Sequence, residues 1–423
     1  MLLTGAYTLA HGELVPQDVL VENGRIVSSF GEGVQADRVL SLHGRVVVPG
    51  LVDVHVHLRE PGFSYKETVL AGTRAAARGG YTTVCAMPNL NPAPDTPEHL
   101  AVEEEIIRRD ACIRVVPYGC ITLGQKGEGE LTDMAALAPR VAGFSDDGRG
   151  VQSESLMRQA MERCKAAGGM IVAHCEDMSL IPAGGAIHAG SYAAAHGIPG
   201  IPSESEWGQI ARDLRLARET GCPYHVCHIS CKESVALIRQ AKAEGVNVTC
   251  ETGPHYLLLS QDDLQDDGRF KMNPPLRDRA DREALLEGLA DGTIDMIATD
   301  HAPHGQEEKA KGLRGSVMGI VGLETAFPLL YTHLVQKGLI SLEKLMELMS
   351  GAPRRRFGFT DGGILPGQRA ELAVLDLDKR WRIDPERFLS LGRSTPFAGW
   401  EVQGDCVMTL CGERMAYKEE ETV

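Results

Sequence analysis

The sequence predicts an α/β protein: a (β/α)8 barrel of the TIM type beside a small β-sandwich made by the two ends of the chain. In the middle of the chain, eight short apolar runs alternate with helical patterns, which is typical of a parallel barrel. Both ends instead carry short β-like runs separated by glycine turns. We therefore expect residues 1–49 and 360–423 to form the sandwich and residues 50–359 to form the barrel.

The two terminal segments have the pattern of short antiparallel strands. Within the first run, Asn23 and Gly24 form a pair that strongly favours a two-residue hairpin turn, because both residues tolerate positive φ. The β-like runs are residues 18–30 and 39–50 near the amino end and residues 370–381 and 400–417 near the carboxyl end.

The barrel is expected to begin with the run LVDVHVH. Its residues are nearly all apolar on both faces of a strand, as in the buried strands of a parallel sheet. We predict the eight barrel strands at residues 51–57, 81–87, 113–121, 141–146, 170–175, 223–229, 246–250 and 294–300. Helical patterns lie between most of these strands, at residues 66–78, 152–167, 205–220, 232–244 and 278–290.

Composition narrows the class of protein. A chain of 423 residues suits one large domain and one smaller domain, and 43% hydrophobic residues are ample for their cores. The net charge of −15 argues against nucleic acid or an anionic membrane as a partner. Eleven cysteines without a repeating spacing indicate reduced thiols. With no signal peptide and no long apolar stretch, we expect a cytoplasmic enzyme.

Two histidines at the end of the first barrel strand are the first chemical signal. His55 and His57 alternate in a strand, so their side chains leave the same face about 7 Å apart, within reach of one metal ion. Arg59 lies two residues further and leaves the same face at the rim. Its guanidinium could pair with a carboxylate of a substrate, and the alternative is a salt bridge with Glu60.

More candidate ligands follow other predicted strands, at the face where barrel enzymes hold their chemistry. They are Asp146, Asp147, His174, His228 and Asp300. Four histidines with two or more carboxylates suit Zn²⁺, and Mn²⁺ or Co²⁺ could substitute. A carboxylate between two metals would hold them about 3.5–4 Å apart. Only one of the adjacent aspartates can face inward, and the residues themselves do not decide which.

The motifs at these positions resemble the bacterial type I dihydroorotases of the amidohydrolase superfamily. The resemblance runs from the first barrel strand to beyond the eighth, in the family order. It rests on VDVHVHLREPG (52–62), AARGGYTTVCAMPN (76–89), GFSDDG (143–148), VAHCED (172–177), HVCHIS (225–230), KMNPPLR (271–277), ATDHAPH (298–304) and GIVGLETAFPLLYTH (319–333).

The resemblance implies a function and a role for each site residue. The function is zinc-dependent, reversible cyclisation of N-carbamoyl-L-aspartate to L-dihydroorotate, the third step of pyrimidine (UMP) biosynthesis, with one or two zinc ions. The implied metal ligands are His55, His57 and Asp300 for the first ion, and His174 and His228 for the second, with Asp147 bridging; Asp300 is also the proton shuttle. The implied substrate contacts are Arg59, Asn89 and His304 to the free carboxylate, and Asn273 with the backbone near Met318 and Gly319 to the ring.

Two departures from related patterns matter. Many members of the family have Pro-Phe-Gly where this chain has Val317-Met318-Gly319; the expected contact uses backbone, so the effect should be small. Dihydropyrimidinases, hydantoinases and many allantoinases bridge their metals with a carboxylated lysine on the fourth strand. Here that strand ends in Ser-Asp-Asp, and the nearest lysines, Lys126 and Lys165, fall in a loop and a helix.

Other interpretations stay open. The protein could be a cyclic amidohydrolase for a ring without a carboxylate, similar to dihydropyrimidinase or allantoinase, or an inactive barrel that acts as a scaffold for a pathway partner. The family suggests a homodimer and an association with a pathway carbamoyltransferase, neither of which the residues indicate. Residues 303–317 could form a lid because they are charged and contain glycine.

The remaining histidines are expected to have lesser roles. His225 should pack behind the barrel, and His301 should face away from the pocket and form a supporting hydrogen bond. His255 is a plausible site residue, whereas His188 and His196 lie in a loop without a readable constraint.

Overall fold

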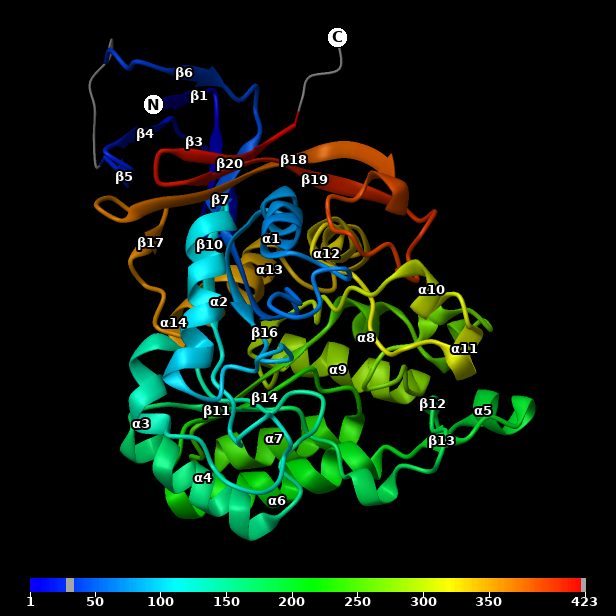
Figure 1. The fold of residues 1–423 in the computed structure, drawn as a ribbon. Helices are drawn as coiled ribbons and strands as arrows, with labels where there is room; N and C mark the ends of the chain where they lie inside the picture. Colours follow the sequence, from blue (N-terminus) through cyan, green and yellow to red (C-terminus); the bar gives the residue numbers. More distant parts are fainter. Residues whose placement is uncertain (28–33, 420–423) are drawn as a thin grey trace.

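The computed structural model describes residues 1–27 and 34–419. Strands from both ends of the chain lie together at one end of the molecule, and the helices and parallel strands of the middle segment lie at the other (Figure 1). The last part of the predicted run 18–30 and the last four residues of the chain fall outside the described residues. None of the described helices is long and apolar enough to cross a membrane.

Among the described residues, the terminal segments form one hydrogen-bonded network of eleven strands. Its main path runs β3-β2-β7-β18-β5-β4-β1-β6, with β17 and β19 also on β18, and β20 on β19. The strands are β1 (Leu2–Thr4), β2 (Tyr7–Ala10), β3 (Glu13–Pro16), β4 (Val19–Glu22), β5 (Arg25–Ile26), β6 (Val39–Ser41), β7 (Val46–Pro49), β17 (Gly362–Gly363), β18 (Arg369–Arg382), β19 (Glu401–Cys411) and β20 (Arg414–Lys418).

Strand β18 joins the two ends of the chain. It pairs antiparallel with β7 and β5 from the amino end and with β19 from the carboxyl end. The predicted hairpin is confirmed, because Asn23 and Gly24 connect β4 to β5 with φ angles of 51° and 71°. These strands enclose a core cluster of their own, whose members include Leu3, Val21, Val47, Leu372, Val374 and Leu410.

The middle segment contains two parallel sheets. The first has the order β10-β9-β8 and the second the order β11-β14-β15-β16. The strands are β8 (Leu51–Val56), β9 (Tyr81–Ala86), β10 (Arg114–Pro117), β11 (Ile171–Ala173), β14 (Tyr224–Val226), β15 (Val248–Thr252) and β16 (Met296–Ile297), with a separate pair β12 (Ile187–His188) and β13 (Gly200–Ile201). Isolated parallel bridges join Phe144 to Gly119 and to Ile171, and Val56 to His301.

Most predicted strands are shorter than expected at their carboxyl ends. The predicted strand 141–146 is present only as the two bridges of Phe144. For the predicted strands 223–229 and 294–300, a physical reason is visible at His228 and Asp300, which have φ angles of 31° and 47°. A backbone in that region cannot continue a β-ladder, so the chain turns out of the sheet where its polar side chains begin.

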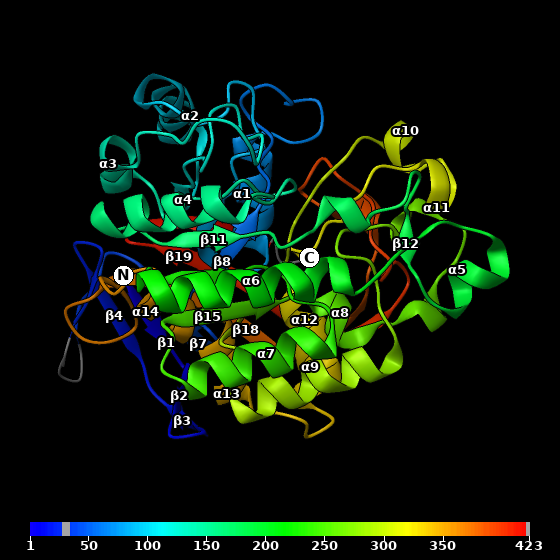
Figure 2. The same ribbon diagram turned by 90° about the horizontal axis from the view of Figure 1, so that it is seen from below.

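Helices cover the parallel strands, and α4, α6, α7 and α9 lie side by side (Figure 2). The five predicted helices are present as α1, α4, α6, α7 and α9. The described helices are α1 (Val69–Arg78), α2 (Pro97–Asp110), α3 (Met134–Leu137), α4 (Glu154–Ala166), α5 (Ser191–His196), α6 (Glu204–Thr220), α7 (Lys232–Ala243), α8 (Pro254–Leu258), α9 (Arg279–Asp291), α10 (Gln306–Lys309), α11 (Gly312–Gly315), α12 (Ala326–Leu330), α13 (Leu342–Met346) and α14 (Ala352–Arg356).

Candidate active site

A cavity of about 250 Å³ lies where the parallel strands end. Its lining residues are His57, Arg59, Asn89, Asp147, Gly148, His174, His228, Asn273, Asp300, Ala302, His304, Met318 and Gly319. All the substrate contacts and all but one of the metal ligands expected from the sequence are in this set. The exception, His55, is fully buried and contacts the lining aspartates directly.

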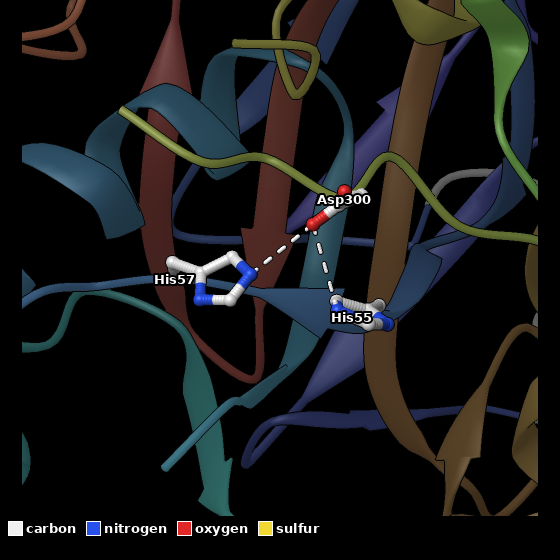
Figure 3. A group of neighbouring side chains, drawn as sticks. All are labelled: His55, His57 and Asp300. Carbon is white, nitrogen blue, oxygen red and sulfur yellow. Dashed lines mark hydrogen bonds and ion pairs between the residues drawn. The ribbon is translucent and has the colours of Figure 1, made fainter. Parts of the chain in front are cut away.

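The first cluster consists of His55, His57 and Asp300 (Figure 3). The Nε2 atoms of His57 and His55 lie 3.1 and 3.5 Å from Oδ1 of Asp300. Both imidazole nitrogens therefore face one carboxylate oxygen from two directions. Three ligand atoms of this kind within 4.8 Å of one another could hold a metal ion.

The second cluster surrounds Asp147. Its Oδ1 lies 3.4 Å from Nε2 of His55, 3.6 Å from Nδ1 of His174 and 3.7 Å from Nε2 of His228. Its Oδ2 lies 3.6 Å from Nε2 of His57. The structure thus brings all four histidines around one carboxylate, and Asp147 lies between the first cluster and the pair formed by His174 and His228.

The neighbouring aspartate faces elsewhere. Asp146 accepts hydrogen bonds from the backbone N–H groups of Ile121, Thr122 and Gly127, and from the hydroxyl of Thr122. These bonds use both carboxylate oxygens to order the loop that follows β10. Asp146 is therefore occupied, whereas Oδ1 of Asp147 is buried without a hydrogen-bond donor among the described residues.

The charges of the two clusters depend on one another. Burial alone would raise the pKa of Asp147, but the charge of His55 and the adjacent imidazoles of His174 and His228 hold it well below its usual range. Burial likewise opposes the charge on His174, yet its contacts with Asp147 and Glu176 raise its pKa to about 10. The ionised carboxylates are compensated by imidazoles, and the charge of Arg59 adds to this compensation.

Several ligand-type atoms of this cluster have no hydrogen-bond partner among the described residues, although they are buried. They are Nε2 of His55, Nδ1 of His57, Oδ1 of Asp147 and Nδ1 of His228. Buried polar atoms are nearly always paired, so several unpaired atoms at one place indicate a bound ion or water. Nδ1 of His174 and Nε2 of His228 also face each other at 3.0 Å. This donor set fits a divalent cation.

A buried carboxylate that the sequence did not single out orients His55. Oε1 of Glu251 lies 2.8 Å from Nδ1 of His55, which holds the ring so that Nε2 faces the aspartates. Oε2 of Glu251 lies 3.1 Å from Nε2 of His225. His225 is thus buried behind the ligands, as expected. Glu251 directly follows a predicted strand, and this position was the only signal for it.

The histidines that were expected to have lesser roles differ in their surroundings. His301 faces away from the cavity, as expected, but it accepts a hydrogen bond from the Gly322 backbone and lies 3.6 Å from Glu67 rather than supporting a metal ligand. The backbone at His301 forms parallel bridges with Val56 on one side and Ile320 on the other. These bridges fix the direction of the side chain, which explains its orientation. His255 is buried with Nε2 unpaired, and burial lowers its pKa to about 4.

The loop histidines lie outside the cavity lining. His188 contacts the guanidinium of Arg277 at 3.2 Å. His196 is exposed, and its Nδ1 lies 2.8 Å from the carbonyl oxygen of Tyr192.

The cavity lining also carries hydrogen-bond donors. Nη2 of Arg59 lies 3.2 Å from Nε2 of His304, and Nε of Arg59 donates to the carbonyl of Pro303. The Asn89 amide donates to the Asp147 carbonyl at 2.8 Å. Arg59 forms no ion pair with Glu60, whose carboxylate instead accepts from the backbone N–H of Val69. The guanidinium is left free to bind an anion.

Two further residues near the cavity were missed. The Asn273 amide donates to Oε2 of Glu176 at 3.1 Å, and the same oxygen lies 3.4 Å from Nε2 of His174. The two-residue spacing of His174 and Glu176 in VAHCED was an available signal, since alternate residues leave one face of a strand. The Gln125 amide donates to the carbonyl oxygen of Asp147 at 2.7 Å, and its loop gave no signal.

Comparisons with known proteins agree with this site. The family model for dihydro-orotase-like proteins matches residues 44–234. The dihydroorotase of Bacillus cereus (strain AH820) is 50% identical over 420 residues, which cover 98% of this chain and 97% of that protein. The dihydroorotase of Bacillus cytotoxicus is 49% identical with the same coverage.

Solved structures show the same fold. L-hydantoinase (dihydropyrimidinase) from Arthrobacter aurescens has a TM-score of 0.89 and 28% identity over 100% of this chain and 97% of that one. Dihydropyrimidinase from Brevibacillus agri has a TM-score of 0.85 and 22% identity, covering 99% of this chain and 95% of that one. The chain is an α/β protein with the fold of these cyclic amide hydrolases, and by its full-length relatives it belongs to the dihydroorotase-like family.

Proposed function

We propose that this protein catalyses the reversible cyclisation of N-carbamoyl-L-aspartate to L-dihydroorotate, the third step of pyrimidine biosynthesis. The observation that carries the proposal is the shared cavity: the histidine and aspartate cluster and the donors of Arg59 and His304 line the same space. A cyclic amide that also carries a free carboxylate needs both sets of groups. Full-length relatives named dihydroorotase support the same reaction.

The cofactor is proposed to be zinc. His55, His57 and Asp300 would hold one ion, His174 and His228 a second, and Asp147 would bridge them. The unpaired buried atoms of His55, His57, Asp147 and His228 support this assignment. When bound, zinc supplies an acidified water near neutral pH and polarises an amide carbonyl. Nitrogen and oxygen ligands of this mix suit zinc.

Asp300 is proposed as the general base and then the general acid. Burial opposes its charge, but the hydrogen bond and charge of His57 and the charge of His55 hold the pKa of Asp300 below its usual range. The ionised carboxylate can take the proton of the attacking water and return it to the ring nitrogen that leaves. In the direction of synthesis, the same group takes the proton of the carbamoyl nitrogen as that nitrogen bonds to the carboxyl carbon, and it returns the proton to the oxygen that leaves as water.

The hydrogen-bond donors of the cavity lining would orient the substrate. Arg59, Asn89 and His304 would bind its free carboxylate, which fixes the amide over Asp300. Asn273 and the backbone of Met318 and Gly319 would contact the ring from another side. Several fixed donors orient the substrate before it reacts. This lowers the entropic part of the activation free energy, and no covalent intermediate is needed.

We propose that residues 50–359 form one closed (β/α)8 barrel, and that residues 1–49 and 360–423 together form a β-sandwich. Parallel bridges at Phe144 and between Val56 and His301 support closure, because they connect the two parallel sheets at both edges. The separate core cluster of the terminal strands supports a second domain. The eleven cysteines, all buried and free, support a reducing, cytoplasmic setting.

A second candidate is hydrolysis of a cyclic amide without a carboxylate, favoured by the likeness to L-hydantoinase. The test is turnover of dihydroorotate, dihydrouracil, hydantoin and allantoin by one sample whose metal content is measured. We expect turnover of dihydroorotate in both directions, with bound zinc. Preference for an uncharged ring would support the second candidate, and a zinc-loaded sample inactive on all four would refute both.

A further inference from the structure

Lys66 contacts Nδ1 of His304, the ring nitrogen that does not contact Arg59 or Met318. It lies between β8 and α1, and its Nζ is 3.1 Å from Nδ1 of His304 and 2.9 Å from Oε1 of Glu308. The side chain is 14% exposed, and its ammonium also lies 5.5 Å from the ring centre of Tyr65. Lys66 is therefore held in place by three neighbours, one of which lines the cavity.

The contacts of the imidazole favour one tautomer once they are weighed against each other: Nε2 lies near an acceptor, the Met318 carbonyl, at 2.8 Å and near a donor, the Arg59 guanidinium, at 3.2 Å, so the shorter contact to the carbonyl outweighs the other. An ammonium group can only donate, so Nδ1 of His304 accepts and carries no proton. The ring proton is then on Nε2, which lies 2.8 Å from the carbonyl oxygen of Met318, a group that can only accept. Burial and the charges of Arg59, Lys66 and Lys309 lower the pKa of His304 to about 2, so the ring is neutral.

The proton that Nε2 donates to the Met318 carbonyl can be shared with an anion that binds at the same nitrogen. Nε2 of His304 and Nη2 of Arg59 are 3.2 Å apart, and both atoms belong to side chains that line the cavity. With the opposite tautomer, His304 would present a lone pair to an incoming carboxylate and would repel it. The tautomer therefore decides whether His304 assists Arg59 or opposes it.

We propose that Lys66 is a positioning residue, which holds His304 as the Nε2–H tautomer so that His304 and Arg59 both donate to the carboxylate of the substrate. This role rests on the proposed function. The alternative is that Lys66 only anchors α10 through Glu308.

Glu308 is what makes Lys66 necessary. Its Oε2 lies 3.7 Å from Nδ1 of His304 and accepts a hydrogen bond from the Gly305 backbone. If the ammonium of Lys66 is removed, a carboxylate becomes the nearest polar neighbour of Nδ1. An ionised carboxylate can only accept, so it draws a proton to Nδ1 and the tautomer changes.

The test combines ring ¹⁵N chemical shifts of ¹⁵N-histidine-labelled protein with steady-state kinetics on dihydroorotate. The variants are Lys66→Met, Lys66→Arg and Glu308→Gln, with the exposed Lys337→Met as a matched control, and His304→Asn assigns the signals. We expect Lys66→Met to protonate Nδ1 and to raise KM about tenfold, the effect of one charge-assisted hydrogen bond, with a smaller change in kcat. Lys66→Arg, Glu308→Gln and Lys337→Met should keep the Nε2–H tautomer.

Two results would overturn the proposal: an unchanged tautomer in folded Lys66→Met, whatever its KM, or a tautomer change in Glu308→Gln equal to that in Lys66→Met. If Lys66→Met does not fold, the double variant Lys66→Met/Glu308→Gln carries the test, with mixed tautomers expected and a single Nε2–H tautomer refuting the role. The ¹⁵N shifts need no turnover. A wild-type enzyme inactive on dihydroorotate would therefore refute the proposed function while the tautomer result still decides the effect of Lys66 on His304.

Discussion

Two buried polar regions of this molecule are built in opposite ways. At the junction of the terminal strands with the parallel strands, the Arg354 guanidinium donates to Glu371, Thr82 and the backbone carbonyls of Gly50 and Gly362 at 2.7 to 3.2 Å. In the candidate active site, ligand-type atoms of His55, His57, Asp147 and His228 have no partner among the described residues. Both regions are charged and nearly inaccessible to solvent.

The difference shows what each region is for. A buried charge whose hydrogen bonds are all made within the protein contributes to a unique fold, and removing its partner is costly. Buried polar atoms without a hydrogen-bond partner favour the binding of a ligand. They also lower the free energy of unfolding of the ligand-free protein. The positive φ angles of Arg59, His228 and Asp300 fit this view, since backbone strain of this kind gathers at functional sites.

The largest expected effect is on the rate of the reaction. Asp300→Asn should lower kcat in both directions at least a thousandfold, about 4 kcal/mol of barrier, because the amide cannot take up a proton. The fold should survive, since a buried, strained carboxylate is replaced by a neutral group of the same shape. Rates in both directions and the thermal unfolding midpoint of the metal-free protein test this. A kcat near that of the wild type would exclude the proton-shuttle role.

The next effect is on the stability of the junction. Arg354→Met should lower the free energy of unfolding by about 3–5 kcal/mol, because Glu371 is left buried without its partner. The double variant Arg354→Met/Glu371→Leu should recover much of this loss. Urea unfolding measures both, and kcat of the folded fraction should stay close to the wild-type value. A loss of activity larger than the loss of folded protein would contradict the separation of the two regions.

The candidate site was largely predictable because its residues obey two local rules. His55 and His57 alternate in a strand, and the other expected ligands follow predicted strands whose carboxyl ends meet at the cavity. These rules do not specify backbone torsions. The positive φ of His228 and Asp300 ended their strands early, and the inward position of Asp147 became visible only once the Asp146 bonds to the next loop were known.

Partners distant in the sequence could not be predicted. Arg354 meets Glu371 and Gly50, Glu251 meets His55, and Lys66 meets His304, and each of these pairings depends on tertiary packing. A charged residue gives the same sequence signal whether it is exposed or paired in a core. Hydrophobic periodicity therefore predicted the elements, but it could not distinguish a junction residue such as Arg354 from a surface arginine.

Metal removal should have an intermediate effect. A ligand that binds only the folded state adds about 2.7 kcal/mol of stability at a concentration one hundred times its Kd. We expect chelation to lower the unfolding free energy of the wild type by about 2–3 kcal/mol, and that of Arg354→Met by the same amount, because distant effects add. Unfolding with zinc and with chelator measures the two increments. Unequal increments would show that the junction and the site are coupled.

The smallest effect concerns Lys309, whose buried ammonium donates to the carbonyls of Lys271 and Val317 but has no ion pair among the described residues. Burial and the charge of Lys271 lower its pKa from 10.5 to about 7. Between these values the unfolded chain binds more protons than the folded one, so this group's cost to stability falls as pH rises from about 7 to 10.5.

We expect wild type to gain about 1–2 kcal/mol relative to Lys309→Met between pH 7 and 10. The full pKa difference would give more, but the two carbonyls favour the ammonium and reduce it. Urea unfolding of both proteins at several pH values measures the gain, and the exposed Lys337→Met provides the control. A constant difference would mean that those two carbonyls fully compensate the burial of the ammonium. Lys309 would then resemble Arg354 at the junction, whose hydrogen bonds are all made within the protein. It would differ from the atoms of the candidate active site that have no hydrogen-bond partner among the described residues.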